Sequence, residues 1–588
     1  MKRSDKISYS VAKLARRLIP AKLVYFYFIL SLALPNILLA ITENFTPLER
    51  CANVLFPLGI YMLIVSLSRQ LGRTIWILLP LILMGAMQIV LLKLYGRSVI
   101  AVDMLLNLTS TNPGEAGELL GNLWPVVAFV CLLYLPSLAM GVWMMVRKVR
   151  LPAYFTLRGR IAAYCVTAAG LVCLILSFVT DRGYAVRRDL YPVNVAYNIS
   201  LATKHTEKLM KRDEMSKNFN FSGVEMHPDS LRELYVLVVG ETSRGDHWQI
   251  NGYQRNTTPL LAKRGDIYSF RRAMSESNTT HKSVPLILSH LDSSTYGDSI
   301  YVVKSIISLF KEAGFETAFV SNQERNGSFI DFFGEEADTT IFMKEKKAPD
   351  ETRTGYDTDL LVELDRLLEK GAHKQLVVLH CYGSHFSYID RYPAEYRKFT
   401  PDGYKEASAG EKEKLVNAYD NSITVTDAVL AGVIERMERN APDMGALVYT
   451  SDHGEDLYDD DRNLFLHASP CPSFYQLRVP FMVWLSPGYV RNRPNAAIAL
   501  QRNVNKRISS SRSFFDTATR LAGIRTSRSN CPDNVASMRY REPERRYLDD
   551  HNRSVALTES GFQSEDLEQL KKLDGQYFYA SGDRAGRR

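Results

Sequence analysis

The sequence predicts an N-terminal transmembrane domain of five helices, followed by an α/β domain with a mostly parallel sheet covered by helices on both faces. Three observations support this fold class. The first third of the 588-residue chain holds five long apolar segments. The rest alternates short runs rich in β-branched residues with helical patterns, which is typical of parallel α/β sheets. Two of these runs end abruptly in polar residues, at Glu241 and at Asp452 with His453.

The apolar segments are long enough to cross a lipid bilayer. A span needs ~20 mainly apolar residues, and ~17 is a practical lower limit. Four segments reach this limit, and the second reaches it only with the serines near its edge. The alternative, buried helices of a soluble protein, is disfavoured because five such segments are difficult to hide in one core. The expected spans are Leu23–Ile41, Val54–Leu67, Ile75–Leu92, Leu123–Val146 and Ile161–Val179.

Lysine and arginine in the short loops predict the orientation of these spans. Basic residues cluster before the first span, between the second and third, and between the fourth and fifth, whereas the other loops hold only Arg50 and Arg97. The positive-inside rule therefore predicts a cytoplasmic N-terminus and places everything after Asp181 outside. The first segment is long and lacks an evident small-residue cleavage site, so we expect a retained anchor and not a cleaved signal peptide.

The net charge of +8 comes from the membrane part of the chain. Residues 1–182 contain 18 Lys and Arg against 7 Asp and Glu, and the remainder contains 54 against 57. The basic surplus therefore follows the topology, and no nucleic-acid partner is expected. The outer part has three cysteines, Cys381, Cys471 and Cys531, which allow at most one disulfide and have no zinc-ribbon spacing.

We expect three regions: a transmembrane domain (1–182), a connector (183–225) and a catalytic domain (226–588). Within the connector, Lys204–Lys217 fits either an interfacial helix or a solvated linker. The C-terminal stretch beyond about Asn495 is rich in Arg and Ser, and its periodicity is weak. The expected strands are Leu234–Val239, Thr317–Ser321, Leu376–His380, Ala446–Thr450 and Pro480–Leu485, and the expected helices are Ile300–Ala313, Asp357–Lys370 and Lys412–Arg439.

Residue types suited to chemistry follow several expected strands: Glu241, Asn322 with Gln323, and Asp452 with His453. In open α/β sheets the functional residues gather beyond the carboxyl ends of the strands. Carboxylate and imidazole groups are usual zinc ligands, and three protein ligands with one open position form the catalytic pattern. Each residue also has an ordinary interpretation as a helix cap or a packed side chain.

A nucleophile is best sought in the hydroxyl-rich stretch Ser277-Asn-Thr-Thr-His-Lys-Ser-Val-Pro285. A helix that begins there would direct backbone N–H groups and the positive end of its dipole toward an anion. A hydroxyl close to a metal ion loses its proton more readily and can attack phosphorus. The alternative is a capped loop that is merely rich in Ser and Thr.

These residues resemble the motifs of one family, the bacterial phosphoethanolamine transferases of the alkaline-phosphatase and sulfatase superfamily. The resemblance covers five membrane helices, a connector and a sulfatase-like periplasmic domain. Its motifs occur in the family's order: Gly240-Glu-Thr-Ser-Arg244, Asn251-Gly-Tyr253, Arg255-Asn-Thr-Thr-Pro259, Thr280-His-Lys-Ser-Val-Pro285 and Ser451-Asp-His-Gly-Glu455.

The resemblance implies roles for individual residues. Glu241, Thr280, Asp452 and His453 would bind one catalytic Zn²⁺, with a second ion left open, and Thr280 would be the nucleophile. Two histidines would line the site as further catalytic residues and contact phosphate or a second metal, and one asparagine would contact substrate. These three residues are His385, His467 and Asn322.

The resemblance also implies the reaction. The chain would transfer phosphoethanolamine from phosphatidylethanolamine to a phosphate of lipid A or of the lipopolysaccharide core, through a phosphoethanolamine-threonine intermediate. It would lie in the bacterial inner membrane as a monomer, with the catalytic domain in the periplasm.

Two departures leave the acceptor open. Three cysteines cannot supply the several disulfides common in the lipid A branch, and Tyr382-Gly-Ser-His385 looks more like the branch that acts on core heptose phosphate. The motifs at Glu241 and Thr280 favour the lipid A branch. A phosphoglycerol transferase or a hydrolase on the same scaffold is the alternative. A transporter or sensor is disfavoured because the spans hold no ionisable residue except Lys93, at an end.

Overall fold

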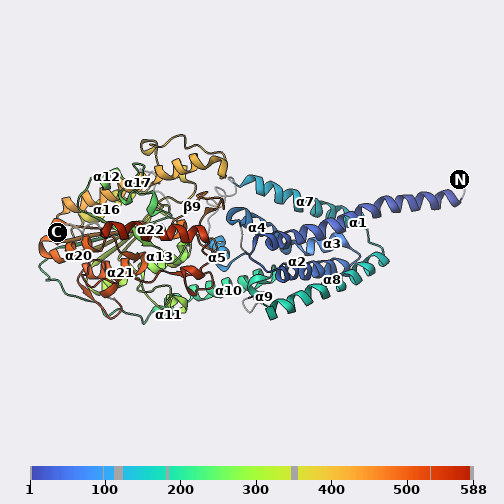
Figure 1. Ribbon diagram of the computed structural model, residues 1–588, viewed down its shortest axis with the longest axis horizontal. Coiled ribbons are helices and arrows are strands. Elements are labelled where there is room, and N and C mark those ends of the chain that lie inside the picture. Colours follow the sequence, from blue (N-terminus) through green and yellow to red (C-terminus); the bar gives the residue numbers. More distant parts are fainter. Residues whose placement is uncertain are drawn as a thin grey trace. The chain divides into compact units, whose positions relative to one another are not determined.

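The computed structural model describes residues 3–96, 99–110, 123–180, 184–345, 355–529 and 531–582 (Figure 1). The chain forms two compact units. The first comprises Met1–Leu105 and Leu120–Thr203, and the second comprises Leu106–Leu119 and Lys204–Arg588. The fold class is the expected one, apolar helices followed by an α/β domain. The boundary near Thr203 divides the expected connector between the two units.

The first unit contains four helices that are long and apolar enough to span a membrane, together with one bent pair that passes the same test. Counting the pair as one span gives the five that were expected. The four single spans are Pro20–Thr42 of α1 (Arg3–Thr42), α2 (Pro47–Leu67), α7 (Trp124–Val146) and α8 (Ala153–Thr180), and the bent pair is α3 (Leu71–Ile77) with α4 (Leu79–Tyr95).

Two spans differ from their expected bounds for local reasons. Helix α2 is a full 21 residues long because Thr46 and Glu49 form a capping box that starts it seven residues early, before the apolar run. The third span is broken at Leu78, and its halves meet at 58°. Pro80 lies in the first turn after the break, where it has no N–H to offer the preceding turn.

The expected connector is largely helical, which favours the helical interpretation over a solvated linker. It contains α9 (Val186–Asp189), α10 (Val193–Met210) and α11 (Arg212–Ser216). The amides of Asn194 and Asn198 both donate to the Ile100 carbonyl within the first unit. In the second unit, Arg212 is buried and pairs with Glu336.

A seven-stranded sheet forms the centre of the second unit, in the order β3-β11-β8-β2-β7-β5-β6. The five strands from β8 to β6 are parallel, and β11 runs antiparallel to both of its neighbours. All five expected strands are confirmed, with ends shifted by one or two residues. The strands are β2 (Glu233–Gly240), β3 (Ile267–Ser269), β5 (Glu316–Ser321), β6 (Thr339–Phe342), β7 (Lys374–His380), β8 (Met444–Ser451) and β11 (Phe481–Leu485).

Helices cover both faces of this sheet. Tyr235, Leu237 and Val239 of β2 belong to a buried cluster with residues of α13 (Thr280–Leu288), α14 (Ile306–Glu312) and α21 (Ser510–Leu521). Helices α16 (Asp359–Glu369) and α17 (Lys412–Asn440) pack against β5 and β2. Figure 1 shows α16 and α17 above the sheet and α13 and α21 below it.

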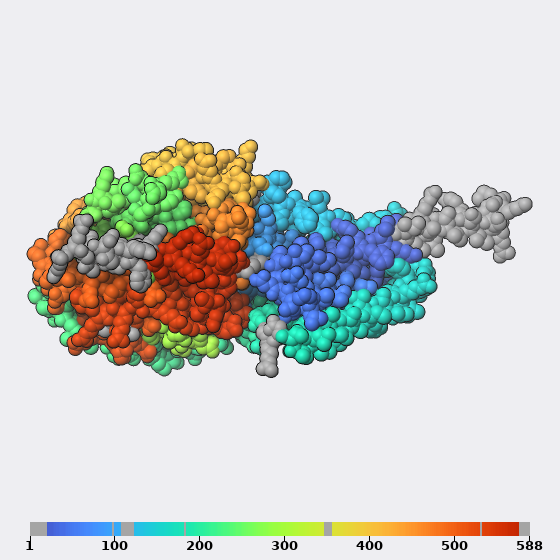
Figure 2. Space-filling view, in the orientation of Figure 1, coloured from blue at the N-terminus to red at the C-terminus, as the bar shows by residue number. Residues whose placement is uncertain are grey.

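Two parts of the second unit differ from the sequence-based prediction. The expected helix Ile300–Ala313 is a 3₁₀ turn (Gly297–Tyr301) followed by α14, because the Ser305 side chain accepts from Ile307 N and starts a new helix. The C-terminal stretch is well structured despite its weak periodicity, and it forms much of the face shown in Figure 2. It contributes α20 (Pro494–Asn503), α21, α22 (Ser564–Gly582) and several two-stranded ladders.

Replacement of Asn36 by Ala is expected to destabilise the first unit. The buried Asn36 amide donates to the carbonyls of Asn53 and Tyr191 and accepts from the Tyr61 hydroxyl. Loss of these bonds in an apolar environment should cost about 1–2 kcal/mol. A lower melting temperature of the detergent-solubilised protein would show it. Leu30→Ala, at an exposed position of the same helix, is the control and should change little.

Candidate active site

The sheet itself brings the candidate metal ligands together. Glu241 follows β2, and Asp452 and His453 follow β8. These two strands are parallel neighbours, and Gly240 is in register with Ser451, the last residue of β8. Adjacent parallel strands that end at the same level place the residues after them side by side. The order of the strands therefore creates the cluster.

The ligand atoms of Glu241, Asp452 and His453 all lie within 4.8 Å of one another, and all three residues are buried. His453 Nε2 lies 3.5 Å from Glu241 Oε1 and 3.2 Å from Asp452 Oδ2. Two carboxylates and one imidazole form a donor set that suits a divalent cation such as Zn²⁺.

Thr280 completes this group from a third element. It is the first residue of α13, with Thr279 as the N-cap in extended conformation. Thr280 Oγ1 donates to Glu241 Oε1 at 3.1 Å and lies 3.1 Å from His453 Nε2. The Thr280 hydroxyl therefore contacts the cluster directly. It lies at the start of a helix, where the helix dipole favours an anion. In the same helix, Ser283 Oγ lies 3.4 Å from Asp452 Oδ2.

The turn after β2 is held tightly from two sides. Thr242 adopts a positive φ of 59°, and its N–H donates to Asp452 Oδ1 at 3.0 Å. On the other side, Gly383 has a φ of +57°, and a Cβ at this position would lie 2.4 Å from the Glu241 carbonyl oxygen. Both constraints fix the backbone that carries the Glu241 carboxylate.

The electrostatics of the cluster indicate that a cation fits it. Burial, together with repulsion from Asp452, raises the pKa of Glu241 above its usual range, and burial likewise raises the pKa of Asp452. Burial lowers the pKa of His453, which leaves its imidazole neutral. Two adjacent buried carboxylates are costly when both are charged, unless a positive ion compensates them. A neutral imidazole is also the form that binds metals.

Hydrogen bonds to Nδ1 orient three histidines. The Nδ1 atoms of His453, His385 and His467 contact Gly454 O at 2.9 Å, Phe386 O at 2.7 Å and Glu455 Oε1 at 3.0 Å, respectively. The two backbone carbonyls can only accept, so in His453 and His385 Nδ1 carries the proton and Nε2 keeps its lone pair. In His453 this nitrogen faces the cluster.

His385 and His467 lie beside the cluster. The ring centroid of His467 is 4.1 Å from that of His453 and 6.2 Å from that of His385. Burial lowers the pKa of His467 to about 4 and that of His385 well below its usual range. Both imidazoles are therefore neutral near pH 7 and act as acceptors in the resting site.

Glu455 is a functional candidate that the sequence analysis did not single out. It is buried, accepts a hydrogen bond from the Tyr388 hydroxyl at 2.5 Å and lies 3.0 Å from His467 Nδ1. Burial raises the pKa of Glu455 to about 8. Its position in the motif Ser451-Asp-His-Gly-Glu455 was the available signal, but only the fold shows that it orients His467.

Asn322 does not contact the cluster. Its side-chain amide donates to Asp357 Oδ1 at 2.8 Å and to the Gly355 carbonyl. The next residue, Gln323, reaches the cluster instead and donates to Glu241 Oε2 at 3.3 Å and to the Cys381 carbonyl at 3.0 Å. A strand that ends in two consecutive amides does not reveal which one faces the site, because this depends on the turn.

A buried arginine supports the loop that carries Asp452 and His453. Arg244 is 1% exposed, pairs with Asp246 and Asp459, and donates to the Glu455 carbonyl at 3.2 Å. Its guanidinium also stacks over the Tyr475 ring at 4.5 Å. Arg244 comes three residues after Glu241. Through these contacts its side chain links the end of β2 to the loop after β8.

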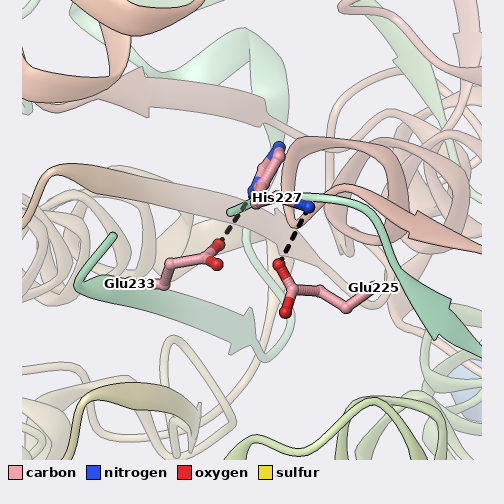
Figure 3. A group of neighbouring side chains, drawn as sticks. All are labelled: Glu225, His227 and Glu233. Atoms are coloured by element: carbon pink, nitrogen blue, oxygen red, sulfur yellow. Dashed lines mark hydrogen bonds and ion pairs between the residues drawn. The ribbon is translucent and has the colours of Figure 1, made fainter. Parts of the chain in front are cut away.

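A second group with metal-ligand residues lies at the opposite end of β2 (Figure 3). Glu233 Oε2 lies 2.9 Å from His227 Nδ1, and Glu225 Oε1 accepts from His227 N at 3.1 Å. The Lys374 ammonium pairs with Glu225 and lies 3.9 Å from Glu233 Oε1. Because lysine already supplies the positive charge, this group is an internal ion-pair network.

Comparison with known proteins agrees with this geometry. Residues 233–524 match the family model described as Sulfatase. The match begins at the first residue of β2 and includes every member of the cluster around Glu241.

The relatives of the chain are named phosphoethanolamine transferases. Phosphoethanolamine transferase EptA of Escherichia coli K12 is 30% identical over 53% of this chain and 57% of its own length. Phosphatidylethanolamine transferase Mcr-2 of Escherichia coli is 28% identical over 70% of this chain and 78% of its own. The chain thus spans little more than half of the EptA sequence. These matches confirm the resemblance that the motifs predicted.

The structural likeness extends beyond the residues that this family model matches. The integral membrane protein lipooligosaccharide phosphoethanolamine transferase A of Neisseria meningitidis has a TM-score of 0.69, with 24% identity over 89% of this chain and 99% of its own. This likeness confirms the architecture of membrane helices followed by a sulfatase-like domain. The apolar helices of the first unit agree with the expected multi-pass membrane protein.

Replacement of Gly383 by Ala is expected to disturb the cluster through the backbone of Glu241. The added Cβ would meet the Glu241 carbonyl, so the cost should exceed the roughly 1–2 kcal/mol of a left-handed residue alone. Gly371→Ala is the matched control, because Gly371 has a similar φ of +69° and open space around it. Equal melting temperatures and equal bound metal in the two variants would contradict this account.

Proposed function

We propose that this chain transfers phosphoethanolamine from phosphatidylethanolamine to a phosphate group of lipid A or of the lipopolysaccharide core, in the inner membrane of a bacterium. The observation that carries the proposal is the contact of the Thr280 hydroxyl with Glu241 and His453 at the start of α13. The name of Mcr-2, a phosphatidylethanolamine transferase, supports the donor class, and that of a further relative, Kdo(2)-lipid A phosphoethanolamine 7''-transferase of Escherichia coli K12, supports the acceptor class.

Four residues would hold the metal ion: Glu241, Asp452, His453 and Thr280. The ion, proposed as Zn²⁺, would act as a Lewis acid toward the phosphoryl group and lower the pKa of a nearby hydroxyl. The protein holds the donors in place beforehand through the paired strand ends and the bonds to Thr242 and Gln323. The number of ions stays open at one or two.

Two transfer steps follow from the position of Thr280. In the first, Thr280 Oγ1 attacks the phosphorus of phosphatidylethanolamine, its proton leaves, and the bond from phosphorus to the glycerol oxygen breaks. That oxygen takes up a proton and leaves as diacylglycerol. In the second, an acceptor phosphate oxygen attacks the phosphorus of the phosphoethanolamine-threonine. The bond from phosphorus to Thr280 Oγ1 breaks, and this oxygen regains a proton. The membrane helices keep the site close to two lipid substrates, which reduces the cost of their encounter.

The neighbouring histidines would position the phosphoryl group and handle protons. Neutral His385 presents an Nε2 lone pair, so it can accept a proton released in the first step and return it later. Glu455 positions His467 beside it through the contact with Nδ1. Asn322 acts indirectly in this arrangement, because its amide supports Asp357, which in turn accepts from Tyr382 N and Gly383 N.

Replacement of Thr280 by Ala should reduce transfer at least about a thousandfold, because the attacking oxygen is removed. Thr279→Ala is the matched control. Its hydroxyl contacts Ser277 Oγ and not the cluster, so its activity should stay near that of the wild type. Mass spectrometry of lipid products and of the tryptic peptide containing Thr280 provides the readout. Full activity of Thr280→Ala would refute the nucleophile assignment.

Removal of metal should abolish transfer and lower the melting temperature. An ion bound only by the folded state stabilises it by about 2.7 kcal/mol when present at one hundred times its dissociation constant. Zinc should restore both properties after chelation, whereas magnesium should not, because it prefers an all-oxygen octahedral site. Glu241→Gln should lower the bound metal per chain. A fully active protein free of metal would contradict the proposal.

The same experiments separate transfer from hydrolysis. A hydrolase on this scaffold would release free phosphoethanolamine at the same rate with and without acceptor. A phosphoglycerol transferase would leave a different mass on Thr280. Mass spectrometry of lipopolysaccharide from cells with and without the protein would also show whether lipid A or the core is modified.

A further inference from the structure

A second pocket lies at the end of the sheet opposite to the active site. It has a volume of about 380 Å³, within the range of small-molecule sites. His227 in its wall is bonded to Glu233, the first residue of β2, whereas Glu241 follows the last one. Eight residues of strand extend roughly 25 Å, so the pocket is separate from the catalytic cluster.

The lining of this pocket is cationic. Arg493 and Arg520 both face it, and no carboxylate is among its lining residues. Within the described parts of the chain, neither arginine has an ion-pair partner. Their positive charge is therefore not compensated by an acidic side chain at the pocket.

Helix α20 adds to this positive potential. It has ten residues and begins at Pro494, so its first turn, with Asn495 and Ala496, lines the pocket. Pro494 has no N–H and Ala496 N–H donates to the Arg493 carbonyl at 3.1 Å, so the helix N-terminus acts here mainly through its dipole, which favours an anion. Two guanidinium groups and a helix N-terminus therefore converge on one cavity.

The rest of the wall suits hydroxyl groups. Asn492 donates to the Asp443 carbonyl and thereby leaves its amide oxygen as an acceptor. Asn534 uses its amide oxygen to accept from Ala536 N, which leaves its NH₂ group as a donor. Side-chain amides of both polarities around a cavity larger than one ion fit a sugar with several hydroxyls. A bare phosphate would occupy only part of the volume.

Gly523 provides the space for the wall formed by His227. Its φ is +68°, and a Cβ at this position would lie 2.6 Å from His227 Nε2. The imidazole can therefore lie against the backbone with Nδ1 toward Glu233, as Figure 3 shows. Behind His227, Lys374 pairs with Glu225 and Asp229 and lies 3.9 Å from Glu233 Oε1, so its charge partly compensates this acidic network.

We propose that this pocket binds a phosphorylated sugar through Arg493 and Arg520, at a site distinct from the catalytic cluster. The guanidinium groups bind the phosphate, which they match in geometry, and the asparagine amides bind the hydroxyls. The proposal does not depend on the reaction proposed for Thr280. Arg493 comes just before the arginine-rich C-terminal stretch and Arg520 lies within it, so this part of the chain acquires a function in this way.

Calorimetric titration of the full-length protein in detergent tests this proposal, with glucose 6-phosphate, inorganic phosphate and glucose as probes. Glucose 6-phosphate should bind saturably and more tightly than phosphate, and glucose should not bind measurably. Arg493→Gln and Arg520→Gln should each weaken glucose 6-phosphate binding about tenfold, since each removes a charged hydrogen bond. Arg502→Gln, on the exposed surface of α20 and outside the pocket, should bind like the wild type.

Variants in the two sites separate the two proposals. Glu241→Gln should leave the arginine-dependent binding unchanged even if it abolishes transfer. Binding lost in Glu241→Gln but kept in both arginine variants would assign it to the catalytic site and overturn the pocket. Phosphate and glucose 6-phosphate binding equally would mean an anion site only. Preference for an acidic peptide over the sugar phosphate would make the pocket a protein contact. Each of these results would refute the proposal.

Discussion

The structure depends most on one electrostatic constraint, the burial of Glu241 and Asp452 next to each other. Two adjacent strands end in carboxylates away from solvent, where each raises the energy of the other's charge. Folding tolerates such a pair only with compensation, from a proton or from a cation. A divalent ion resolves the conflict for both carboxylates and for the lone pair of His453. The architecture around them is consistent with the retention of that ion.

An inner and an outer set of groups support the two buried carboxylates. Thr242 N, Gln323 Nε2 and Ser283 Oγ contact the carboxylates, and the backbone carbonyl of Gly454 fixes the His453 ring. Beneath them, the buried Arg244 links the end of β2 to the loop after β8 through Asp459 and the Glu455 carbonyl. None of these supporting groups contributes chemistry of its own. They hold the reactive atoms at fixed distances, which is a requirement for catalysis by positioning.

The charge of acidic residues is compensated differently at the two ends of the sheet. At the carboxyl end no lysine or arginine of the described residues pairs with the acidic cluster, so it suits a metal ion. At the amino end Glu225 and Glu233 have Lys374, so they form a network with His227. Next to that network the excess charge is positive, because Arg493 and Arg520 have no ion-pair partner in the described part of the chain. Unbalanced charge in a folded domain is costly, and both places where it occurs are therefore candidates for ligands.

The sequence by itself determined which segments are apolar, which runs form strands, and which polar residues follow those strands. Hydrophobic length fixed the spans, and the five predicted strands agree with the sheet because buried parallel strands have a clear apolar signature. Glu241, Asp452 and His453 stood out as polar residues at strand ends, whereas Thr280 was selected within its hydroxyl-rich stretch by the family resemblance.

Only the tertiary structure decided what these residues contact. Strand order, which is a property of long-range pairing, made β2 and β8 neighbours and placed Glu241 beside Asp452. The turn after β5 directed Gln323 and not Asn322 to the cluster, and the fold of a weakly periodic stretch brought Arg493 and Arg520 to one pocket. Local sequence determines the propensity and the apolar pattern of each segment. Contacts between distant residues arise only when the whole domain packs. The geometry of the functional sites depends on such contacts.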